Sequence, residues 1–474
     1  MRLKSAKFEI PPENIFKNDK LKRDIPIKNL TGILKNVRDP FVACINASYG
    51  QGKTTFIELW RAYLESIGVH SILFNAWEND YTENSLACII AEIKSALDKK
   101  IKLIKPEDRR SVEEQFDKMV KLGAKVVKAA LPAAVKIATS GVLKIDNFCE
   151  DIIGEFAEKS TETIIKEYSK NKDLFVEFKE ALHKNISYLS KEHPFFIFVD
   201  ELDRCRPDFA VEVLETIKHL FDVEGVIFIL TLDEKHIEAV IKNTYGSEVD
   251  AFGYMRRFVD LSYSLPVADK EDYCREMFQR FDLTSYFVER EKGINIKDPE
   301  SFKSIEASAI GVVQYFKLTL REIEKIFTKL AIVLQTTPKD QCLYPYVLFL
   351  LLILHLKDNE IYKKIVRKEI KMIDVIKYLC RKLQISEEEL FNRKNSVFLN
   401  FLVWLNMFMS ASGVSDGYKE LYTDLASKFS SNNEVKNIID WMCKYSEQLQ
   451  FDWSISGALK LLDERIDFMS KVNT

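Results

Sequence analysis

The apolar residues of this chain gather into short continuous runs, and each run ends in polar or small residues. Four runs have the length of a strand: the segment from Val42 to the loop at Ala47, "VHSILFN", Phe195–Val199 and "GVIFILTL". Continuous apolar runs of this length are typical of parallel strands that helices cover on both faces. We therefore predict a parallel α/β sheet that binds its ligand at the carboxyl ends of the strands.

Helical patterns lie between these runs. After the third run, Pro207 and Asp208 mark a helix start, and an apolar stripe follows at Val213, Ile217 and Leu220. From about residue 266 onward no convincing strand remains, and the pattern is helical to the end. The run from Leu343 to Leu356 is shorter than the roughly 20 residues that a membrane span requires. We predict that it is a buried helix and that the chain has no transmembrane span.

The spacing of these patterns predicts the domain organisation. The interval between Lys53 and Asp200 is longer than a minimal doubly wound core needs, so it must contain an insertion. We expect an N-terminal lobe with the first half of the core over 1–99, a helical insertion over 100–170, the second half of the core over 171–265, a helical lid over 266–340 and a C-terminal helical domain over 341–474.

Composition narrows the class of protein. Of the 474 residues, 47% are hydrophobic and 30% are charged, and the net charge is -3. These values exclude a disordered chain and a surface that is basic throughout, so any nucleic-acid binding would be local. Eight cysteines lie far apart without a C-x-x-C pair or zinc-ligand spacing, and the N-terminus lacks the apolar core of a secretory signal. We expect a cytoplasmic protein with reduced thiols.

The loop "ASYGQGKT" after the first predicted strand is the strongest chemical signal. It differs from the Walker A pattern G-x-x-x-x-G-K-[ST] at its first position, where Ala47 replaces glycine. Alanine is tolerated there if its φ is negative. Unpaired N–H groups at a helix start favour an anion, and a lysine adds charge for β and γ phosphates. The residues expected to bind the nucleotide are Ser48, Tyr49, Gly50, Gln51, Gly52, Lys53, Thr54 and Thr55.

Two acids follow the third apolar run. Asp200 at the strand end and the hydroxyl of Thr54 are expected to hold Mg²⁺, with Asp200 acting through water. Glu201 could orient and deprotonate an attacking water. The alternative is that Asp200, Glu201, Asp203 and Arg204 form a solvated loop of charges that caps the next helix. If Glu201 alone is a capping acid, Asp203 would orient the water.

The chain resembles the KAP family of P-loop NTPases. "INASYGQGKTT" is similar to the family's N-G-x-W-G-x-G-K-[ST]-T loop, "FNAWEN" to its F-N-A-W element, and "FVDELDRCRPD" to its D-D-L-D-R-C-x-P element. The resemblance extends through "VEVLETIKHLFDVEGVIFILTLDE" and "GYMRRFVDLSYSLP", over roughly residues 15 to 330. Ala47 and Tyr49 depart from Gly and Trp in the loop, and Glu201 replaces the second Asp of the acidic element.

The resemblance implies roles for single residues. Lys53, Thr54 and Asp200 would bind Mg-ATP, and Glu201 would support hydrolysis. Thr231 and Asp233 would lie where related ATPases keep a γ-phosphate sensor. Arg256 or Arg257 resembles an arginine finger and Arg321 the sensor of a helical lid, since a fixed cation stabilises charge on the transferred phosphoryl group. The alternative for these arginines is a surface ion pair.

The resemblance also implies a function. We expect a KAP-type ATPase that serves as a conformational switch or assembly platform for a protein partner such as a co-encoded effector. A homo-oligomer and a role in bacterial anti-phage defence are part of this expectation. One alternative is a scaffold that binds nucleotide without turnover and docks to a membrane surface or a signalling partner. Another is a nucleic-acid translocase, against which the missing basic groove pattern counts.

The predicted insertion carries a lysine face. Lys118, Lys121, Lys125 and Lys128 are spaced by three or four residues, so they share one side of a helix. Residues 118–145 could therefore lie on an anionic membrane surface. The alternative is the solvated face of a helix packed on the core or on a partner, which is the commoner arrangement.

Overall fold

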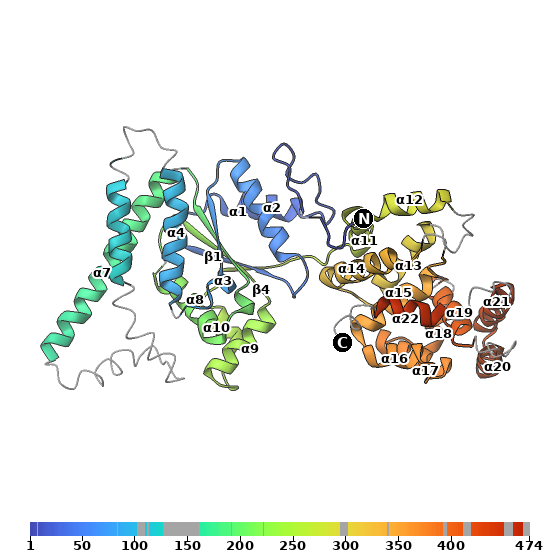
Figure 1. Cartoon of the computed structure of the whole chain (residues 1–474). Helices are drawn as coiled ribbons and strands as arrows, with labels where there is room; N and C mark the ends of the chain where they lie inside the picture. Colours follow the sequence, from blue (N-terminus) through green and yellow to red (C-terminus); the bar gives the residue numbers. More distant parts are fainter. Residues whose placement is uncertain are drawn as a thin grey trace. The chain divides into compact units, whose positions relative to one another are not determined.

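The structure is a computed structural model of the whole chain (Figure 1). It describes residues 1–6, 8–82, 84–101, 110, 113–126, 161–190, 192–220, 222–293, 302–338, 341–391, 396–410, 419–449 and 458–467. The chain divides into two compact units. One comprises Phe8–Val267, and the other comprises Met1–Lys7 together with Ala268–Thr474.

The first unit is built on a sheet of five strands in the order β2-β3-β4-β1-β5, and every neighbouring pair is parallel. The strands are β1 (Phe41–Asn46), β2 (Ser71–Asn75), β3 (Phe195–Asp200), β4 (Val226–Leu232) and β5 (Leu261–Ser264). This sheet confirms the predicted α/β class. The pattern did not predict β5, because this short edge strand alternates half-buried with exposed residues and has no apolar run.

Helices cover both faces of this sheet (Figure 1). They are α1 (Asp24–Leu34), α2 (Lys53–Ser66), α3 (Ala76–Asn79), α4 (Ser85–Ile101), α7 (Thr161–Leu189), α8 (Pro207–Leu220), α9 (Glu234–Tyr245) and α10 (Ala251–Met255), with a short 3-10 helix, η2 (Leu202–Arg204). Helix α8 begins at the predicted proline, and its stripe residues Val213 and Ile217 are buried.

Strand β3 is apolar up to its last residue because helices bury both of its faces. Phe196 and Phe198 point to the face covered by α1 and α2, where they pack around Trp60. Ile197 and Val199 point to the opposite face, which α4, α8 and α9 cover. Both faces of the strand are thus buried, as period-two alternation between two helical layers requires.

Within the predicted insertion, the structure describes the first part of α7, which begins at Thr161, and a helix over residues 113–126. Its apolar residues, including Met119 and Leu122, belong to the core shared with α4 and α7, whereas Lys118, Lys121 and Lys125 are exposed. Over this stretch the helix thus buries its apolar residues and exposes its lysines, and contact with a membrane surface stays a prediction. Lys128 and the rest of the proposed membrane-facing segment lie outside the described residues. Within the described residues, no helix is both long and apolar enough to cross a membrane.

The regular secondary structure of the second unit is entirely helical in the residues that the structure describes. The helices are α11 (Lys270–Arg280), α12 (Leu283–Gly293), α13 (Phe302–Tyr315), α14 (Leu320–Thr336), α15 (Pro345–Lys357), α16 (Asn359–Val366), α17 (Met372–Leu383), α18 (Glu387–Leu390), α19 (Ser396–Ser410), α20 (Lys419–Lys428), α21 (Asn433–Leu449) and α22 (Ala458–Ile466). Residues Val347 to Leu354 of α15 are all buried, which confirms the predicted buried helix.

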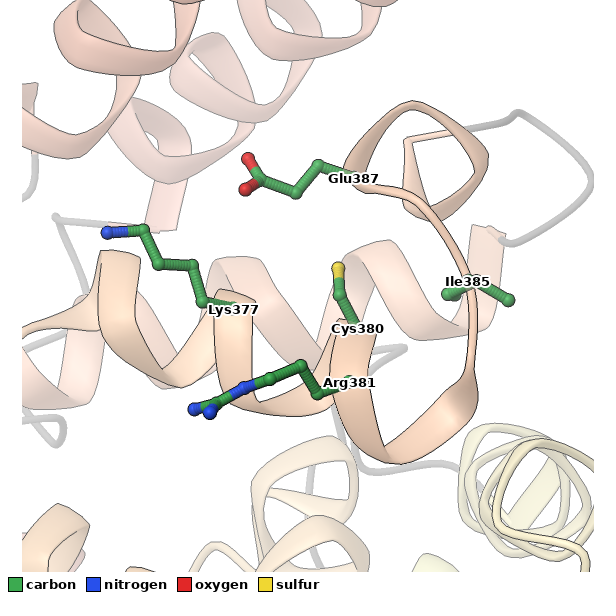
Figure 2. Close-up of a pocket in the computed structure, with 5 residues that line it drawn as sticks. All are labelled: Lys377, Cys380, Arg381, Ile385 and Glu387. Atoms are coloured by element: carbon green, nitrogen blue, oxygen red, sulfur yellow. The ribbon is translucent and has the colours of Figure 1, made fainter.

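Two further features belong to this helical unit. The first residues of the chain pair with the end of α11, where Ala6 N–H donates to the Arg280 carbonyl at 3.1 Å. A surface pocket of about 550 Å³ opens beside α17 (Figure 2). Its lining residues are Lys377, Cys380, Arg381, Ile385 and Glu387. None of the predicted site residues lines this pocket.

Candidate functional site

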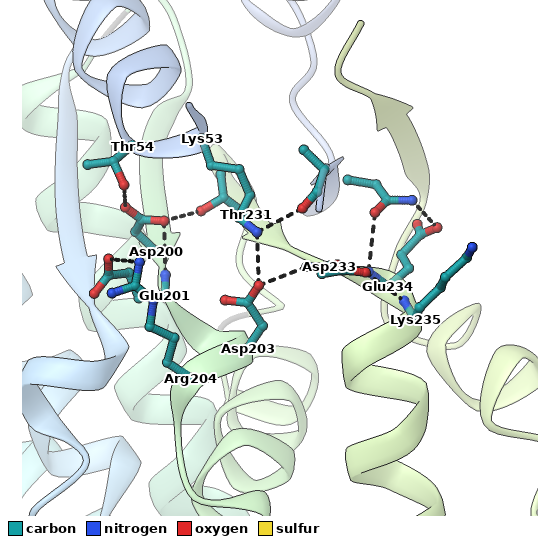
Figure 3. A network of polar contacts seen from close by, with 12 residues as sticks. Lys53, Thr54, Asp200, Glu201, Asp203, Arg204, Thr231, Asp233, Glu234 and Lys235 are labelled. Carbon is teal, nitrogen blue, oxygen red and sulfur yellow. Dashed lines mark hydrogen bonds and ion pairs between the residues drawn. The ribbon is translucent and has the colours of Figure 1, made fainter. Parts of the chain in front are cut away.

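The predicted site residues of the first unit meet at the carboxyl edge of the sheet. Strand β4 lies between β1, which leads into the loop, and β3, which ends in Asp200. This order places Thr231 of β4 between the loop lysine and the acids of β3 (Figure 3). The strand order thus brings together residues that are far apart in the sequence.

The loop between β1 and α2 is shaped for an anion. Gly50 and Gly52 have φ values of 78° and 83°, a conformation that residues with a Cβ rarely adopt. No side chain caps the start of α2, so its first N–H groups are available to an acceptor. Ala47 does not have a positive φ and its N–H donates to the Leu232 carbonyl at 3.1 Å, so alanine is tolerated at this position.

Lys53 is held by two acceptors. Its ammonium donates to the Ala47 carbonyl at 2.8 Å and to Asp203 Oδ2 at 2.9 Å. The side chains of Lys53 and Asp203 are only 10% and 7% exposed, so this ion pair is largely shielded from water. Asp203 also accepts a hydrogen bond from the Asp233 N–H at 3.1 Å. Asp203 is therefore a partner of the loop lysine, a role that the sequence pattern did not indicate.

Both carboxylate oxygens of Asp200 accept hydrogen bonds from hydroxyl groups. Its Oδ2 accepts from the Thr54 hydroxyl at 3.1 Å, and its Oδ1 accepts from the Thr231 hydroxyl at 2.6 Å. Asp200 is 3% exposed, which excludes a solvated loop for this residue. Thr54 and Asp200 fit a Mg²⁺ site, because a hydroxyl and a buried carboxylate, both oxygen donors that this ion prefers, face each other here.

Glu201 follows directly, with its backbone in the left-handed region at φ 61° and ψ 24°. Its carboxylate forms an ion pair with Arg204 at 2.9 Å and makes no capping hydrogen bond to η2. Burial raises the pKa of Glu201, and the positive charge of Arg204 opposes that rise. The geometry thus gives a carboxylate at the edge of the site, and its role in hydrolysis stays a prediction.

A second polar pair joins the ends of β1 and β4. Asp233 caps α9 by accepting from the Lys235 N–H at 3.2 Å. Asn46 donates to Glu234 Oε2 at 2.6 Å, and Asn46 Oδ1 accepts from the Glu234 N–H at 3.2 Å. Asn46 and Glu234 were not among the predicted site residues. Their only signal was a polar residue at the end of each apolar run.

None of the three predicted arginines belongs to the phosphate loop or to the strand ends that form the site. Arg256 and Arg257 follow α10 and are exposed, and neither forms an ion pair with a described residue. The Arg256 guanidinium lies 5.2 Å from the ring centroid of Phe252. Arg321 lies on α14 of the helical unit. Their roles as arginine finger and lid sensor stay predictions.

A phosphate-binding loop after β1, a buried Asp at the end of β3 and a hydroxyl on the strand between them define the P-loop NTPase class. A model described as the KAP family P-loop domain matches residues 23–337. The chain therefore belongs to the KAP family of P-loop NTPases, as its motifs predicted.

Comparisons with curated proteins and with solved structures add no further assignment. A search of curated proteins finds no match. Among solved structures, the chain is similar to the Aeropyrum pernix ORC2 protein in its ADP form, with 10% identity and a TM-score of 0.34. For the ADPNP-ADP complexes of the same protein, the identity is 11% and the TM-score is 0.31. In both comparisons, the alignment covers 99% of this chain and 98% of the other.

Proposed function

We propose that this chain binds and hydrolyses Mg-ATP and uses the two nucleotide states as a switch for a protein partner. The observation that supports this most directly is the Thr54 hydroxyl facing Asp200 at 3.1 Å, beside the loop lysine. A hydroxyl at the helix start and a buried acid at a strand end are the residue types that hold the metal in P-loop NTPases. Glu201 beside them supplies the carboxylate that hydrolysis needs.

In this proposal, each residue of the site has a separate role in binding or hydrolysis. The loop N–H groups and Lys53 bind phosphate oxygens, and Thr54 and Asp200 hold the metal. When bound, Mg²⁺ neutralises charge on the phosphates. Glu201 orients a water molecule and accepts its proton, since its carboxylate lies next to Asp200 and is paired with Arg204 at the edge of the site. Thr231 keeps Asp200 oriented through a hydrogen bond of 2.6 Å.

The switch has its effect through another protein in this proposal, because the chain combines the nucleotide site with a separate unit of helices. A partner such as a co-encoded effector, a homo-oligomer and a role in anti-phage defence complete the proposal, and all three rest on the family resemblance. The alternative, a nucleotide-binding scaffold without turnover, would have the same loop but would release no phosphate.

The test is phosphate release by purified wild type and by Glu201→Gln, with ATP affinity measured on the same samples. The amide keeps the size of the side chain but cannot take a proton, so turnover should fall by roughly 10² while affinity changes little. Glu65→Gln is the matched control, because this exposed glutamate lies at the other end of α2. Normal turnover by Glu201→Gln would refute the catalytic role, and no turnover by wild type would favour the scaffold.

Lys53→Ala completes the set. This variant should lose ATP binding altogether, because it removes the cation that lies against the phosphates. If wild type binds ATP and the variant binds it equally well, the loop is not the nucleotide site. Co-purification of partners with Glu201→Gln in ATP, compared with wild type in ADP, tests the switch itself.

A further inference from the structure

Three of the sequence motifs meet in one stack of side chains. The Arg204 guanidinium lies 5.0 Å from the ring centroid of Tyr49 and 5.5 Å from that of Trp77. Tyr49 comes from the phosphate loop, Trp77 from α3 after β2, and Arg204 from η2 after β3. An arginine within about 6 Å of an aromatic face is attracted to it by a cation–π interaction. The two rings therefore restrain one guanidinium.

The same guanidinium holds Glu201. Its Nη2 lies 2.9 Å from Glu201 Oε1, so Arg204 is the cation that pairs with this carboxylate among the residues that the structure describes. The Glu201 backbone is held as well, because its N–H donates to Asp200 Oδ1 at 2.9 Å and its carbonyl accepts from the Arg204 N–H at 3.0 Å. The side chain and the backbone of Glu201 are thus both held in place (Figure 3).

We propose that Arg204, restrained by Tyr49 and Trp77, is a positioning residue that orients the Glu201 carboxylate for its work on water. This inference rests on the proposed hydrolysis, because it assigns a role in that reaction. Arginine suits the task better than lysine, since its planar guanidinium can stack on rings while its edge pairs with a carboxylate. The stack also links Glu201 to the phosphate loop, because Tyr49 belongs to that loop.

The first test compares turnover and ATP affinity in Arg204→Gln and Arg204→Lys. A general base that is misplaced by about 1 Å can lose roughly 10² in rate, so we expect kcat of Arg204→Gln to fall at least tenfold with ATP affinity within about twofold of wild type. Arg204→Lys keeps the charge but loses the stacking, so it should recover only part of the loss. Arg206→Gln is the matched control, because Arg206 pairs with Asp80 instead of Glu201.

The second test separates positioning from a purely structural role. If Arg204 acts through Glu201, Arg204→Gln should slow turnover in the wild-type background but cause no further loss in Glu201→Gln. Trp77→Ala should lower kcat in the same direction, whereas Tyr81→Ala, which alters a side chain that is 85% exposed, should not. The tryptophan variant also covers the case in which Arg204→Gln does not fold.

The outcomes have distinct meanings. Unchanged turnover in both Arg204→Gln and Trp77→Ala would overturn the inference and leave the proposed hydrolysis intact. Faster turnover would overturn it too, since the ion pair would then restrain Glu201 in an inactive position. An equal loss in the Glu201→Gln background would show that Arg204 acts by another route. Absence of turnover in wild type would overturn both the hydrolysis and this inference.

Discussion

The ion pair between Lys53 and Asp203 gives a prediction about thermal stability. Removing it should lower the Tm of the free protein and increase the rise in Tm that Mg-ATP causes. The atoms of the pair are 2.9 Å apart and its side chains are 10% and 7% exposed. Removing one partner of a buried ion pair typically costs about 3–5 kcal/mol, because the remaining charge stays buried. Asp203→Asn removes the negative charge but keeps an oxygen that can accept from Lys53 and from the Asp233 N–H.

We therefore expect a smaller loss for Asp203→Asn, about 2 kcal/mol of unfolding free energy, since a hydrogen bond to a charged group retains roughly 1.5–3 kcal/mol. For a unit of this size, that loss lowers Tm by about 4–8 °C. Nucleotide should reduce or cancel this difference, because the phosphates supply the negative charge that Lys53 has lost. The rise in Tm on adding Mg-ATP should thus be larger for Asp203→Asn than for wild type, by about 4 °C or more.

Thermal unfolding with and without Mg-ATP measures both effects on the same samples. Asp208→Asn is the matched control, because it makes the same chemical change nearby at a side chain that is 56% exposed. The control should unfold like wild type in both conditions. Equal ATP-induced shifts in Asp203→Asn and wild type would refute the reasoning, since Lys53 would then not exchange its carboxylate for phosphates.

Three further predictions concern two residues of the site and the pair of predicted finger arginines. Thr54→Ala should weaken Mg-ATP binding about tenfold but leave ATP binding in EDTA unchanged, because the hydroxyl acts on the metal; an equal loss in EDTA would contradict this. Thr231→Val should lower the free energy of unfolding by about 1–3 kcal/mol in chemical denaturation, because the buried Asp200 loses a donor; unchanged stability would argue against that bond. The last prediction uses a mixture of two inactive proteins, Lys53→Ala and an Arg256→Gln, Arg257→Gln double variant. The mixture should regain ATPase activity if these arginines act across a subunit boundary. No gain in a protein that forms oligomers would mean that the arginines act in cis or only in structure.

The sheet and its ligand edge could be predicted because they depend on local pattern. A strand that is covered on both faces must be apolar at every position, so β1, β3 and β4 each leave a continuous run. A run also shows where the strand ends, and the carboxyl ends of parallel strands share one edge. Asp200, Glu201 and Thr231 were therefore expected at the site before their contacts were known.

The contacts within the site could not be predicted in this way. They depend on strand order, and a hydrophobic pattern does not tell which strand lies beside which. The pairing of Lys53 with Asp203 requires β4 to lie between β1 and β3, and the contact of Asn46 with Glu234 requires β4 next to β1. The stack on Arg204 needs β2 next to β3, which brings Trp77 close. Edge strand β5 was missed for a different reason, since half of its residues face solvent.

The left-handed backbone of Glu201 has a consequence for how this sequence can vary. A residue with a Cβ at φ 61° is less stable there than glycine, by about 1–2 kcal/mol. Mutagenesis that selects only for thermal stability should therefore enrich glycine or asparagine at this position. Those variants would lose the carboxylate that the proposed chemistry uses, so selection for stability and selection for turnover would drive position 201 in opposite directions.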